Sequence, residues 1–248
     1  MQTADAVDKT KQTMILVPAF NEGDRIAEVI LSARQSYPDY DVIVVNDGSQ
    51  DDTAQKAGEA GATVINHLDN MGYGVAIQTG YKYAQRKGYD FLVQIDGDGQ
   101  HDPAGIADLL RPVIAGETDF ALGSRFLSRQ SYEPSLARRS GMRLFRHIVS
   151  WCIGQRITDS TSGFQAFNRA VIGFFTTSAF PSDYPDADML LTLHRAGYSI
   201  REVPVRMFAS SSGKSMHGGW KPLYYLFKML LSVFVTLLRK RESGREER

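Results

Sequence analysis

The sequence predicts an α/β domain with a doubly wound, mostly parallel sheet. Short runs rich in β-branched residues alternate with segments of helical periodicity, a pattern typical of parallel strands joined by helices. Polar and acidic residues gather where those runs end, which is where ligands bind in such sheets. The 248 residues are enough for one such domain with a substantial core.

The first part of the chain carries the alternation most clearly. We expect strands over residues 14–17, 41–45, 62–67 and 89–95. We expect helices over residues 22–36, 51–60 and 73–87, the first of them capped by Asn21. The glycine turn at residues 70–76 indicates either a backbone that approaches a ligand or close packing of the next helix on the sheet.

Composition divides the chain into four parts. Residues 1–13 lack the basic and apolar regions of a signal peptide, so we expect a disordered leader there. The folded domain is expected over residues 14–220, an amphipathic helix over 221–240 and a charged tail over 241–248. The single cysteine, Cys152, cannot form an internal disulfide, which fits a reducing compartment.

Charge is unevenly spread along the chain, although the net charge is zero. Residues 1–123 carry 19 acids and nine bases, whereas residues 124–156 carry seven arginines and one acid, Glu133. This segment could be a solvated linker. Its many apolar residues argue against a purely solvated loop. Its arginines favour an anion-binding strip, because a guanidinium group grips two oxygens of a phosphate.

Two carboxylates follow the last of these expected strands, in the stretch QIDGDGQH. Asp96 and Asp98 are two residues apart, so in an extended segment both side chains point to one place. Such a pair is costly without a cation, and Mg²⁺ or Mn²⁺ prefers carboxylate and amide oxygens, with Gln100 as a further ligand. The alternative is a polar turn whose acids cap the backbone.

Seven motifs occur in order over residues 14–215: VPAFNEGDRI, VVNDGSQDDT, NMGYGVAIQTGYKYA, IDGDGQHDP, GSRF, TDSTSGFQAF and IREVPV. Together they resemble family 2 glycosyltransferases of the GT-A fold, most closely the polyprenyl-phosphate sugar synthases of the dolichol-phosphate mannose synthase type. The resemblance implies a metal-dependent, inverting transfer of a sugar from a nucleotide-diphosphate sugar to dolichyl or undecaprenyl phosphate. It implies no nucleic-acid partner.

The resemblance also implies a role for individual residues. Metal ligands would be Asp96, Asp98 and Gln100, holding Mg²⁺ or Mn²⁺. Donor-binding residues would be Pro18, Phe20, Glu22, Asp47, Asp96, Gly97, Asp98, Gln100 and Lys214. The acceptor phosphate would meet Arg125, Arg139 and Ser162. The family often has an arginine where this chain has Ser210, and Arg206 or Lys214 would take its place.

Asp98, Arg125 and Asp188 are the expected catalytic residues. A lipid phosphate is already ionised at neutral pH, so its transfer needs positioning and charge neutralisation and no strong base. A sugar hydroxyl would need a base, and Asp188 is the candidate, with a structural or acceptor-positioning role as the alternative. His101 is expected to pack beside the metal ligands, and Trp151 and Trp220 to be interfacial or core aromatics.

Two amphipathic segments suggest a lipid surface. Residues 142–153 place Arg143, Arg146, His147 and Ser150 on one helical face. Residues 221–238 carry a polar stripe that includes Lys228 and Thr236, and their apolar run is shorter than the ~20 residues that span a bilayer. We expect this helix to lie in the interface or dock on a separate small integral membrane protein; a core helix is the alternative.

We therefore expect a peripheral protein on the cytoplasmic face of a membrane. Two other functions compete with a polyprenyl-phosphate sugar synthase. One is a GT-A glycosyltransferase acting on a sugar hydroxyl in cell-envelope glycan assembly. The other is a non-catalytic nucleotide-sugar-binding scaffold for a membrane partner, which the intact pair of Asp96 and Asp98 argues against.

Overall fold

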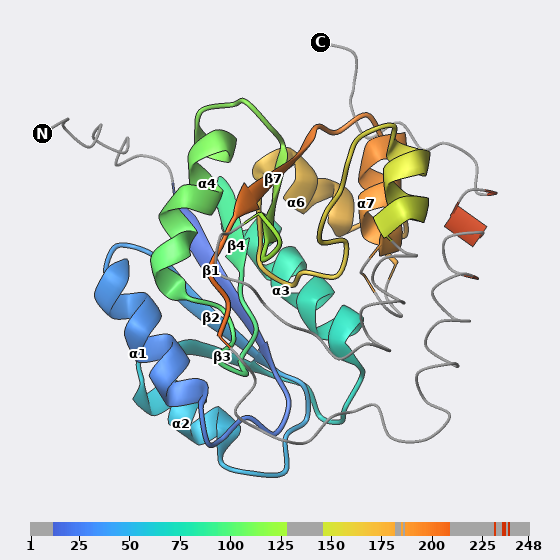
Figure 1. Cartoon of the computed structure of the whole chain (residues 1–248). Coiled ribbons are helices and arrows are strands. Elements are labelled where there is room, and N and C mark those ends of the chain that lie inside the picture. Colours follow the sequence, from blue (N-terminus) through green and yellow to red (C-terminus); the bar gives the residue numbers. More distant parts are fainter. Residues whose placement is uncertain are drawn as a thin grey trace, which may run out of the picture.

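The computed structural model describes residues 12–127, 146–181, 185, 187–208, 231, 235–236 and 238. Its centre is a seven-stranded sheet in the order β3-β2-β1-β4-β6-β5-β7, with helices on both faces (Figure 1). Every pairing is parallel except the two made by β6. The predicted doubly wound, mostly parallel sheet is therefore confirmed.

The strands are β1 (Thr13–Ala19), β2 (Asp41–Asn46), β3 (Thr63–Asn66), β4 (Phe91–Gln94), β5 (Phe120–Ser124), β6 (Gln165–Asn168) and β7 (Ile200–Pro204). The helices are α1 (Ile26–Ser36), α2 (Thr53–Glu59), α3 (Tyr73–Lys87), α4 (Ile106–Ile114), α6 (Arg169–Phe175) and α7 (Ala187–Arg195). A short 3₁₀ turn, η1 (Pro103–Gly105), leads into α4, and residues 146–153 are also helical.

The predicted start of the first helix, at residue 22 with Asn21 as its cap, is wrong. Helix α1 begins at Ile26, so Asn21 does not cap it. Asn21 instead adopts a left-handed conformation with φ of 54°, which asparagine tolerates better than most residues. Its backbone N–H donates to Ser49 Oγ at 2.9 Å, and its side-chain oxygen accepts from the Gln50 N–H at 2.9 Å. Asn21 thus joins the loop after β1 to the loop after β2.

The strand lengths explain why β1 can carry a proline. Pairing between β1 and β4 runs only to Leu16 and Gln94, whereas pairing between β1 and β2 continues through Pro18 and Val45. Proline lacks an N–H, and it is tolerated here because the ladder to β4 has already ended. The end of β1 therefore stands beside the loop that contains the two predicted metal ligands.

The antiparallel strand β6 brings a distant loop to the same edge. Gln165, the first residue of β6, pairs with Gln94, the last residue of β4. The TDSTSGF segment (residues 158–164) leads into β6, so it arrives where the QIDGDGQH segment leaves β4. A strand that ran parallel to β4 would have begun at the opposite edge.

Two hydrophobic cores cover the two faces of the sheet. Residues from α1, α2 and α4 form one, and residues from α3, α6, α7 and the helical segment 146–153 form the other (Figure 1). Val149 and Ile153 are buried in the second core, and Ser150 bonds to the backbone N–H and carbonyl of Ile157. The apolar face predicted to meet lipid in this segment therefore packs inside the protein. Trp151 points outward, 84% exposed, and is not a core residue.

Four helical residues of the predicted segment 221–240 are described: Leu231, Val235, Thr236 and Leu238. Thr236 is buried, whereas the three apolar residues are exposed. Over the described part of the chain, no helix is both long and apolar enough to cross a membrane. The rest of that segment, residues 1–11 of the predicted leader, and the predicted tail 241–248 lie outside the described residues.

Candidate active site

The loops after β1 and β2 interlock and hold Glu22 at the rim of the site. The Glu22 N–H donates to Thr53 Oγ1 at 2.8 Å, and the Gly23 N–H donates to Asp51 Oδ2 at 3.1 Å. A Cβ at position 23 would lie 2.0 Å from Asp52 Oδ1, so a larger residue would force this side chain to move. Glycine fits here without that movement, and the two hydrogen bonds hold the backbone at Glu22 and Gly23 in place.

Three acids, Glu22, Asp96 and Asp98, gather at the carboxyl ends of β1 and β4. Burial raises the pKa of Asp96, and the charge of Asp98 raises it further, against opposing effects of His101, a Tyr73 hydrogen bond and Arg125. Burial likewise raises the pKa of Glu22, followed by the charge of Asp98, while Arg25 lowers it. Burial and the charge of Asp98 thus both disfavour the ionised forms of Asp96 and Glu22, a cost that a bound cation relieves.

The donor atoms of this site suit Mg²⁺ or Mn²⁺. They are carboxylate oxygens, which hard divalent cations prefer. Within the described residues, no group of three or more His, Cys, Asp or Glu side chains could hold a metal ion. The two aspartates would therefore leave coordination positions open for other ligands, and phosphate oxygens commonly fill such positions. The residues present fit the metal that the sequence predicts.

Gln100 orients one of these aspartates. Its backbone N–H donates to Asp98 Oδ1 at 3.0 Å, and its side-chain nitrogen donates to Asp98 Oδ2. These two hydrogen bonds fix the orientation of the Asp98 carboxylate. The prediction that Gln100 also gives a carbonyl oxygen to the metal stays a prediction.

The acids are closely surrounded by backbone and by one ring. A Cβ on Gly97 would lie 3.2 Å from the Pro18 carbonyl oxygen, and a Cβ on Gly163 would lie 2.6 Å from Asp96 Oδ2. His101 is buried; its Nδ1 accepts from the Asp96 N–H at 3.0 Å. Its ring stacks on Phe164 with centroids 5.1 Å apart, so the prediction that it packs beside the metal ligands is confirmed.

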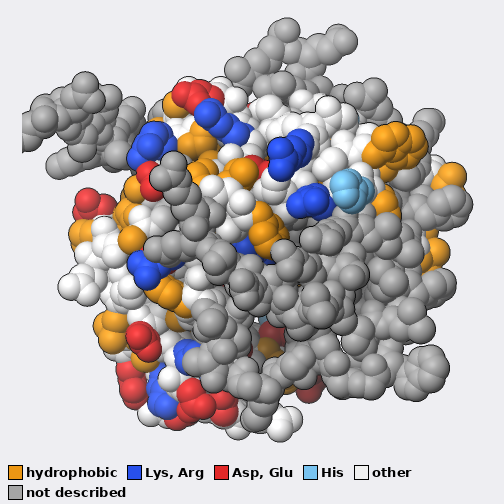
Figure 2. All heavy atoms as spheres, in the orientation of Figure 1, with side chains coloured by type: hydrophobic (Ala, Val, Ile, Leu, Met, Phe, Trp, Pro, Cys, Tyr) orange, Lys and Arg blue, Asp and Glu red, His pale blue; other side chains and the backbone are white. Residues whose placement is uncertain are grey.

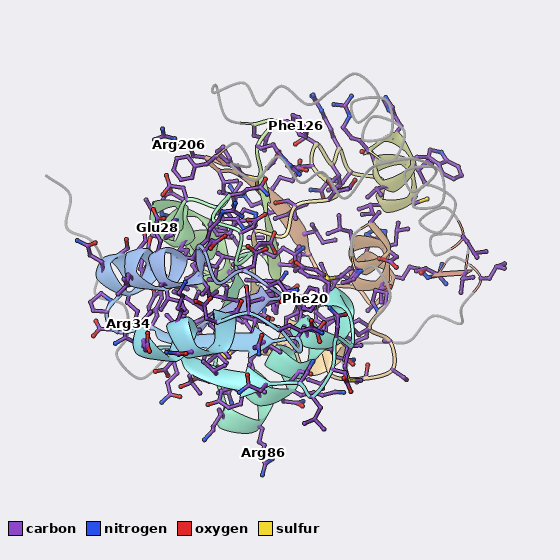
Figure 3. All side chains as sticks on the ribbon, turned by 90° about the horizontal axis from the view of Figure 1, so that it is seen from below. Phe20, Glu28, Arg34, Arg86, Phe126 and Arg206 are labelled. Carbon is purple, nitrogen blue, oxygen red and sulfur yellow. The ribbon has the colours of Figure 1, made fainter. Side chains whose placement is uncertain are left out.

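The residues predicted for the nucleoside lie around the same strand ends. Phe20, after β1, is exposed and lies near the middle of the view in Figure 3. Asp47, after β2, is buried, and it accepts from the N–H groups of Met71 at 3.0 Å and Gly72 at 2.8 Å, and pairs with His67 Nδ1 at 2.7 Å. Asp47 therefore shapes the glycine turn before α3, and its contact with a base stays a prediction.

Arg125 is engaged by a buried partner inside the protein. Its Nε donates to Asp159 Oδ2 at 2.6 Å and its Nη2 to Asp159 Oδ1 at 2.9 Å, and the Asp159 side chain is fully buried. Beside this pair, the hydroxyls of Ser124 and Thr158 lie 2.6 Å apart. The fork that was predicted to grip an acceptor phosphate is thus turned onto Asp159.

Glu202, in β7, anchors the start of the TDSTSGF segment. Its carboxylate accepts from the N–H groups of Thr158 and Asp159, both at 2.8 Å. Burial raises the pKa of Glu202, the hydrogen bonds to its carboxylate lower it, and the charge of Asp159 raises it. Further along, Ser162 is buried and its Oγ accepts from the Phe164 N–H at 3.3 Å. Its predicted contact with the acceptor phosphate stays a prediction.

The remaining predicted residues fall elsewhere. Asp188 is buried in the first turn of α7, and its Oδ1 accepts from the Met189 N–H at 2.8 Å. Arg206 is exposed, its guanidinium lies 5.2 Å from the centre of the Phe208 ring, and it points outward at the edge of Figure 3. The other predicted residues lie outside the described part of the chain: Arg139, Ser210, Lys214 and Trp220.

Comparison with known proteins agrees with this geometry. Residues 14–174 match glycosyl transferase family 2. The chain belongs to this family.

Two relatives of this family 2 glycosyltransferase match most of its length. It is 29% identical to polyprenol monophosphomannose synthase of Mycolicibacterium smegmatis, over 90% of this chain and 87% of the relative. It is 26% identical to the UDP-N-acetylglucosamine–dolichyl-phosphate N-acetylglucosaminyltransferase of Methanococcus voltae, over 88% of this chain and 96% of the relative. The two relatives carry different sugars in their names and share a polyprenyl-type acceptor.

Solved structures of glucosyl-3-phosphoglycerate synthase from Mycobacterium tuberculosis share the fold. One, in complex with Mn²⁺, UDP and phosphoglyceric acid, superposes with a TM-score of 0.66, and another, with Mg²⁺ and UDP, with a TM-score of 0.67. Each is 24% identical and covers 92% of this chain and 78% of the other. The likeness confirms the GT-A fold.

Five residues that shape the site of this glycosyltransferase were not singled out from the sequence: Tyr73, Gln94, Asp159, Gly163 and Glu202. All of them lie within or beside recognised motifs, which was the available signal. None could be assigned a partner, because each partner lies far away along the chain. Arg125 and Asp159, for example, are separated by 34 positions.

Proposed function

We propose that this chain is a metal-dependent, inverting glycosyltransferase that moves a sugar from a nucleotide-diphosphate sugar to a polyprenyl phosphate, such as dolichyl or undecaprenyl phosphate. The observation that carries the proposal is the group of Glu22, Asp96 and Asp98 at the strand ends, where burial raises the pKa of Glu22 and Asp96 and the charge of Asp98 raises both further. The polyprenyl acceptor is supported by the names of relatives that match about nine tenths of the chain.

Asp96 and Asp98 would hold Mg²⁺ or Mn²⁺, with Gln100 beside them. When bound, the metal ion neutralises negative charge that develops on the nucleoside diphosphate as it leaves. Gly97, between the aspartates, lets this loop lie against the backbone of Pro18. Pro18, Phe20 and Asp47 would line the nucleoside pocket.

Lys214 would approach the donor diphosphate. The described chain that leads toward it is tied to the metal-binding loop: the Phe208 N–H donates to the Gln100 carbonyl at 2.7 Å, and Met207 forms a β-bridge with His101. Lys214 is six residues beyond Phe208, so the distance between the two residues is at most ~20 Å even if the chain between them is fully extended. Arg206 points outward, which leaves Lys214 as the better replacement for the arginine absent at Ser210.

The acceptor phosphate would meet arginines of residues 124–156. Its oxygen is ionised at neutral pH, so the protein needs to position it and neutralise charge, and no strong base is required. Because Asp159 engages the fork of Arg125, Arg139 and its neighbours are the better candidates for direct contact, and Ser162 is a further candidate. The buried Asp188 gives no specific support to transfer onto a sugar hydroxyl.

A lipid surface would present this acceptor. Leu231, Val235 and Leu238 are exposed while Thr236 is buried, as expected for a helix whose apolar side rests on lipid. Figure 2 shows basic side chains and a histidine beside apolar ones on the upper part of its face. The protein would then be peripheral, at the cytoplasmic face of a membrane. A separate small integral membrane protein is the other candidate cover for these residues.

A transfer assay tests the proposal. Radiolabelled UDP- and GDP-sugars are each incubated with Mn²⁺ and vesicles that contain or lack undecaprenyl phosphate. We expect label in the lipid fraction only with the lipid phosphate present, abolished by EDTA and restored by added Mn²⁺. Transfer that survives EDTA would refute the metal, and label only in water-soluble glycans would refute the acceptor.

A further inference from the structure

A chain of hydrogen bonds runs from the hydrophobic core to Asp96. It begins at Tyr81, a fully buried residue of α3 whose ring packs against Phe167, Phe175 and Phe180. The Tyr81 hydroxyl donates to Gln94 Oε1 at 2.6 Å. Gln94 ends β4 and is only 1% exposed, so this bond is made away from water.

The bond from Tyr81 fixes the direction of the Gln94 amide. A glutamine side chain has one oxygen, which accepts, and one nitrogen, which donates. With the oxygen held by Tyr81, the nitrogen must face the site, where it donates to the Tyr73 hydroxyl at 2.9 Å and lies 3.4 Å from the Gly163 carbonyl. A flipped amide would place its nitrogen against the donating Tyr81 hydroxyl.

The bond from Gln94 in turn fixes the Tyr73 hydroxyl. A hydroxyl has a single proton, and since this one accepts from Gln94, its proton is directed at Asp96 Oδ1, 3.0 Å away. Asp96 Oδ2 lies on the other side, against the backbone of Gly163 and 3.7 Å from His101 Nε2, which is too long for a hydrogen bond. Oδ1 of Asp96 is therefore held by the hydrogen bond from Tyr73, whereas Oδ2 faces His101 without a hydrogen bond to its ring.

We infer that Tyr73 is a positioning residue for metal binding: Tyr81 and Gln94 direct its hydroxyl onto Asp96 Oδ1, which aims this carboxylate at the cation. The inference rests on the proposed function, in which Asp96 and Asp98 hold the metal. Partners that orient a ligand typically change metal affinity 10–100-fold when they are removed. The same three side chains could instead merely stabilise the core, so the test must measure the metal.

Electron paramagnetic resonance of Mn²⁺ provides that measurement, without added nucleotide and with UDP or GDP. Tyr73→Phe should raise the dissociation constant for Mn²⁺ about 10–100-fold. In transfer assays the Mn²⁺ needed for half-maximal rate should rise in parallel, and saturating Mn²⁺ should restore most of kcat. Tyr73 is an exposed residue, so loss of its hydroxyl should leave the fold intact.

Gln94→Glu gives an independent test. A carboxylate cannot donate, so the Tyr73 hydroxyl would turn its proton toward position 94 and release Asp96, although Tyr73 is still present. This variant should match Tyr73→Phe, and the double variant should be no weaker than either single variant. If Gln94→Glu does not fold, Tyr81→Phe removes the inner donor and should weaken Mn²⁺ binding in the same direction.

Tyr89→Phe is the matched control. The Tyr89 hydroxyl also donates to a carboxylate, Asp41 Oδ2 at 2.7 Å, but at the opposite end of the sheet, so its loss should leave Mn²⁺ affinity unchanged. Mn²⁺ affinity of Tyr73→Phe within twofold of wild type, or an equal loss in Tyr89→Phe, would overturn the inference. Asp98→Asn separates the two proposals, because wild-type Mn²⁺ binding in that variant would refute the metal site itself.

Discussion

The two sides of the site treat charge in opposite ways. On the proposed donor side, formed by the loops after β1 and β4, burial raises the pKa of Glu22 and Asp96, and the charge of Asp98 raises both further. On the proposed acceptor side, formed by the end of β5, residues 158–164 and β7, Arg125 is paired with buried Asp159, and Glu202 accepts from two N–H groups. The first side carries negative charge that a bound cation would neutralise. On the second side, the charged groups are already paired with other groups of the protein.

The comparison teaches that a charged residue beside a site can be there for either of two reasons. The acids on the proposed donor side are partly buried close to one another, which destabilises the folded protein until a cation binds. Their loss should therefore reduce function and spare the fold. Acceptor-side charges hold the loops of the protein in place, so their loss should harm the fold first. Variants on each side can break or sharpen this distinction.

The largest effect is expected for Arg125→Ala. Removing one partner of a buried ion pair strands the other charge, here Asp159, and typically lowers the free energy of unfolding by ~3–5 kcal/mol. Urea unfolding followed by circular dichroism would measure it. Arg111→Ala, which breaks an exposed pair with Asp108, should cost at most ~1 kcal/mol. If Arg125→Ala were as stable as wild type, the acceptor side would not be held together by this pair.

Asp98→Asn should show the reverse pattern. Transfer is expected to fall about 100–1000-fold, the range for losing a group that stabilises transition-state charge. The free energy of unfolding should stay within ~0.5 kcal/mol of wild type or rise, since repulsion with Glu22 and Asp96 is relieved. The assay is initial-rate transfer with Mn²⁺, and Asp108→Asn, an exposed acid on α4, is the control that should leave transfer unchanged and cost at most ~1 kcal/mol, since it only breaks the exposed pair with Arg111. A large loss of stability in Asp98→Asn would erase the distinction.

Gly163→Ala tests the contact between residues 158–164 and Asp96. The new Cβ would lie 2.6 Å from Asp96 Oδ2, and relieving such a contact typically costs ~1–3 kcal/mol. We expect weaker Mn²⁺ binding by titration, together with a modest fall in the urea midpoint. Gly58→Ala is the control, because a Cβ there meets nothing within 4 Å and should stabilise α2 by ~0.5–1 kcal/mol. Unchanged Mn²⁺ affinity in Gly163→Ala would show that Asp96 can move without consequence.

The smallest effect is expected for Glu202→Gln, and it depends on pH. Burial raises the pKa of Glu202 in the folded protein, so its contribution to stability is present below the unfolded pKa and is lost as pH rises through the folded pKa. The variant lacks this contribution. The free energy of unfolding of wild type, relative to that of the variant, should therefore increase as pH falls from 7 toward 4. Urea unfolding at each pH would measure it. A difference that shrinks over this range would contradict the assignment.

The parts of the fold that local sequence determines could be predicted. Helix α3 was expected over residues 73–87 and begins and ends there, since Gly72 and Gly88, both with positive φ, bound its pattern. Asp96 and Asp98 were expected to converge because of extended backbone, whereas β4 ends at Gln94 and Asp98 lies in the turn that follows. The antiparallel insertion of β6 between β4 and β5 could not be foreseen, because no local pattern states which strand a segment pairs with.

The same reasoning explains the limits at the site. An arginine after a strand looks identical in sequence whether its partner is a ligand phosphate or an internal aspartate, so Arg125 suggested only a phosphate. Tyr73 and Gln94 lie 21 positions apart and meet only when α3 packs on the sheet. Asn21 looked like a helix cap, yet its side chain is used by the backbone of Gln50 in a neighbouring loop.

The ends of residues 126–157 are fastened together, since Ser124 meets Thr158 and Arg125 meets Asp159. A segment whose two ends are clasped can change length at little thermodynamic cost, about 0.6 kcal/mol for each doubling of a flexible loop. Its composition is constrained where Val149 and Ile153 pack in the core. The clasp thus fixes where this stretch leaves the sheet and where it returns, whatever length of chain lies between these two points.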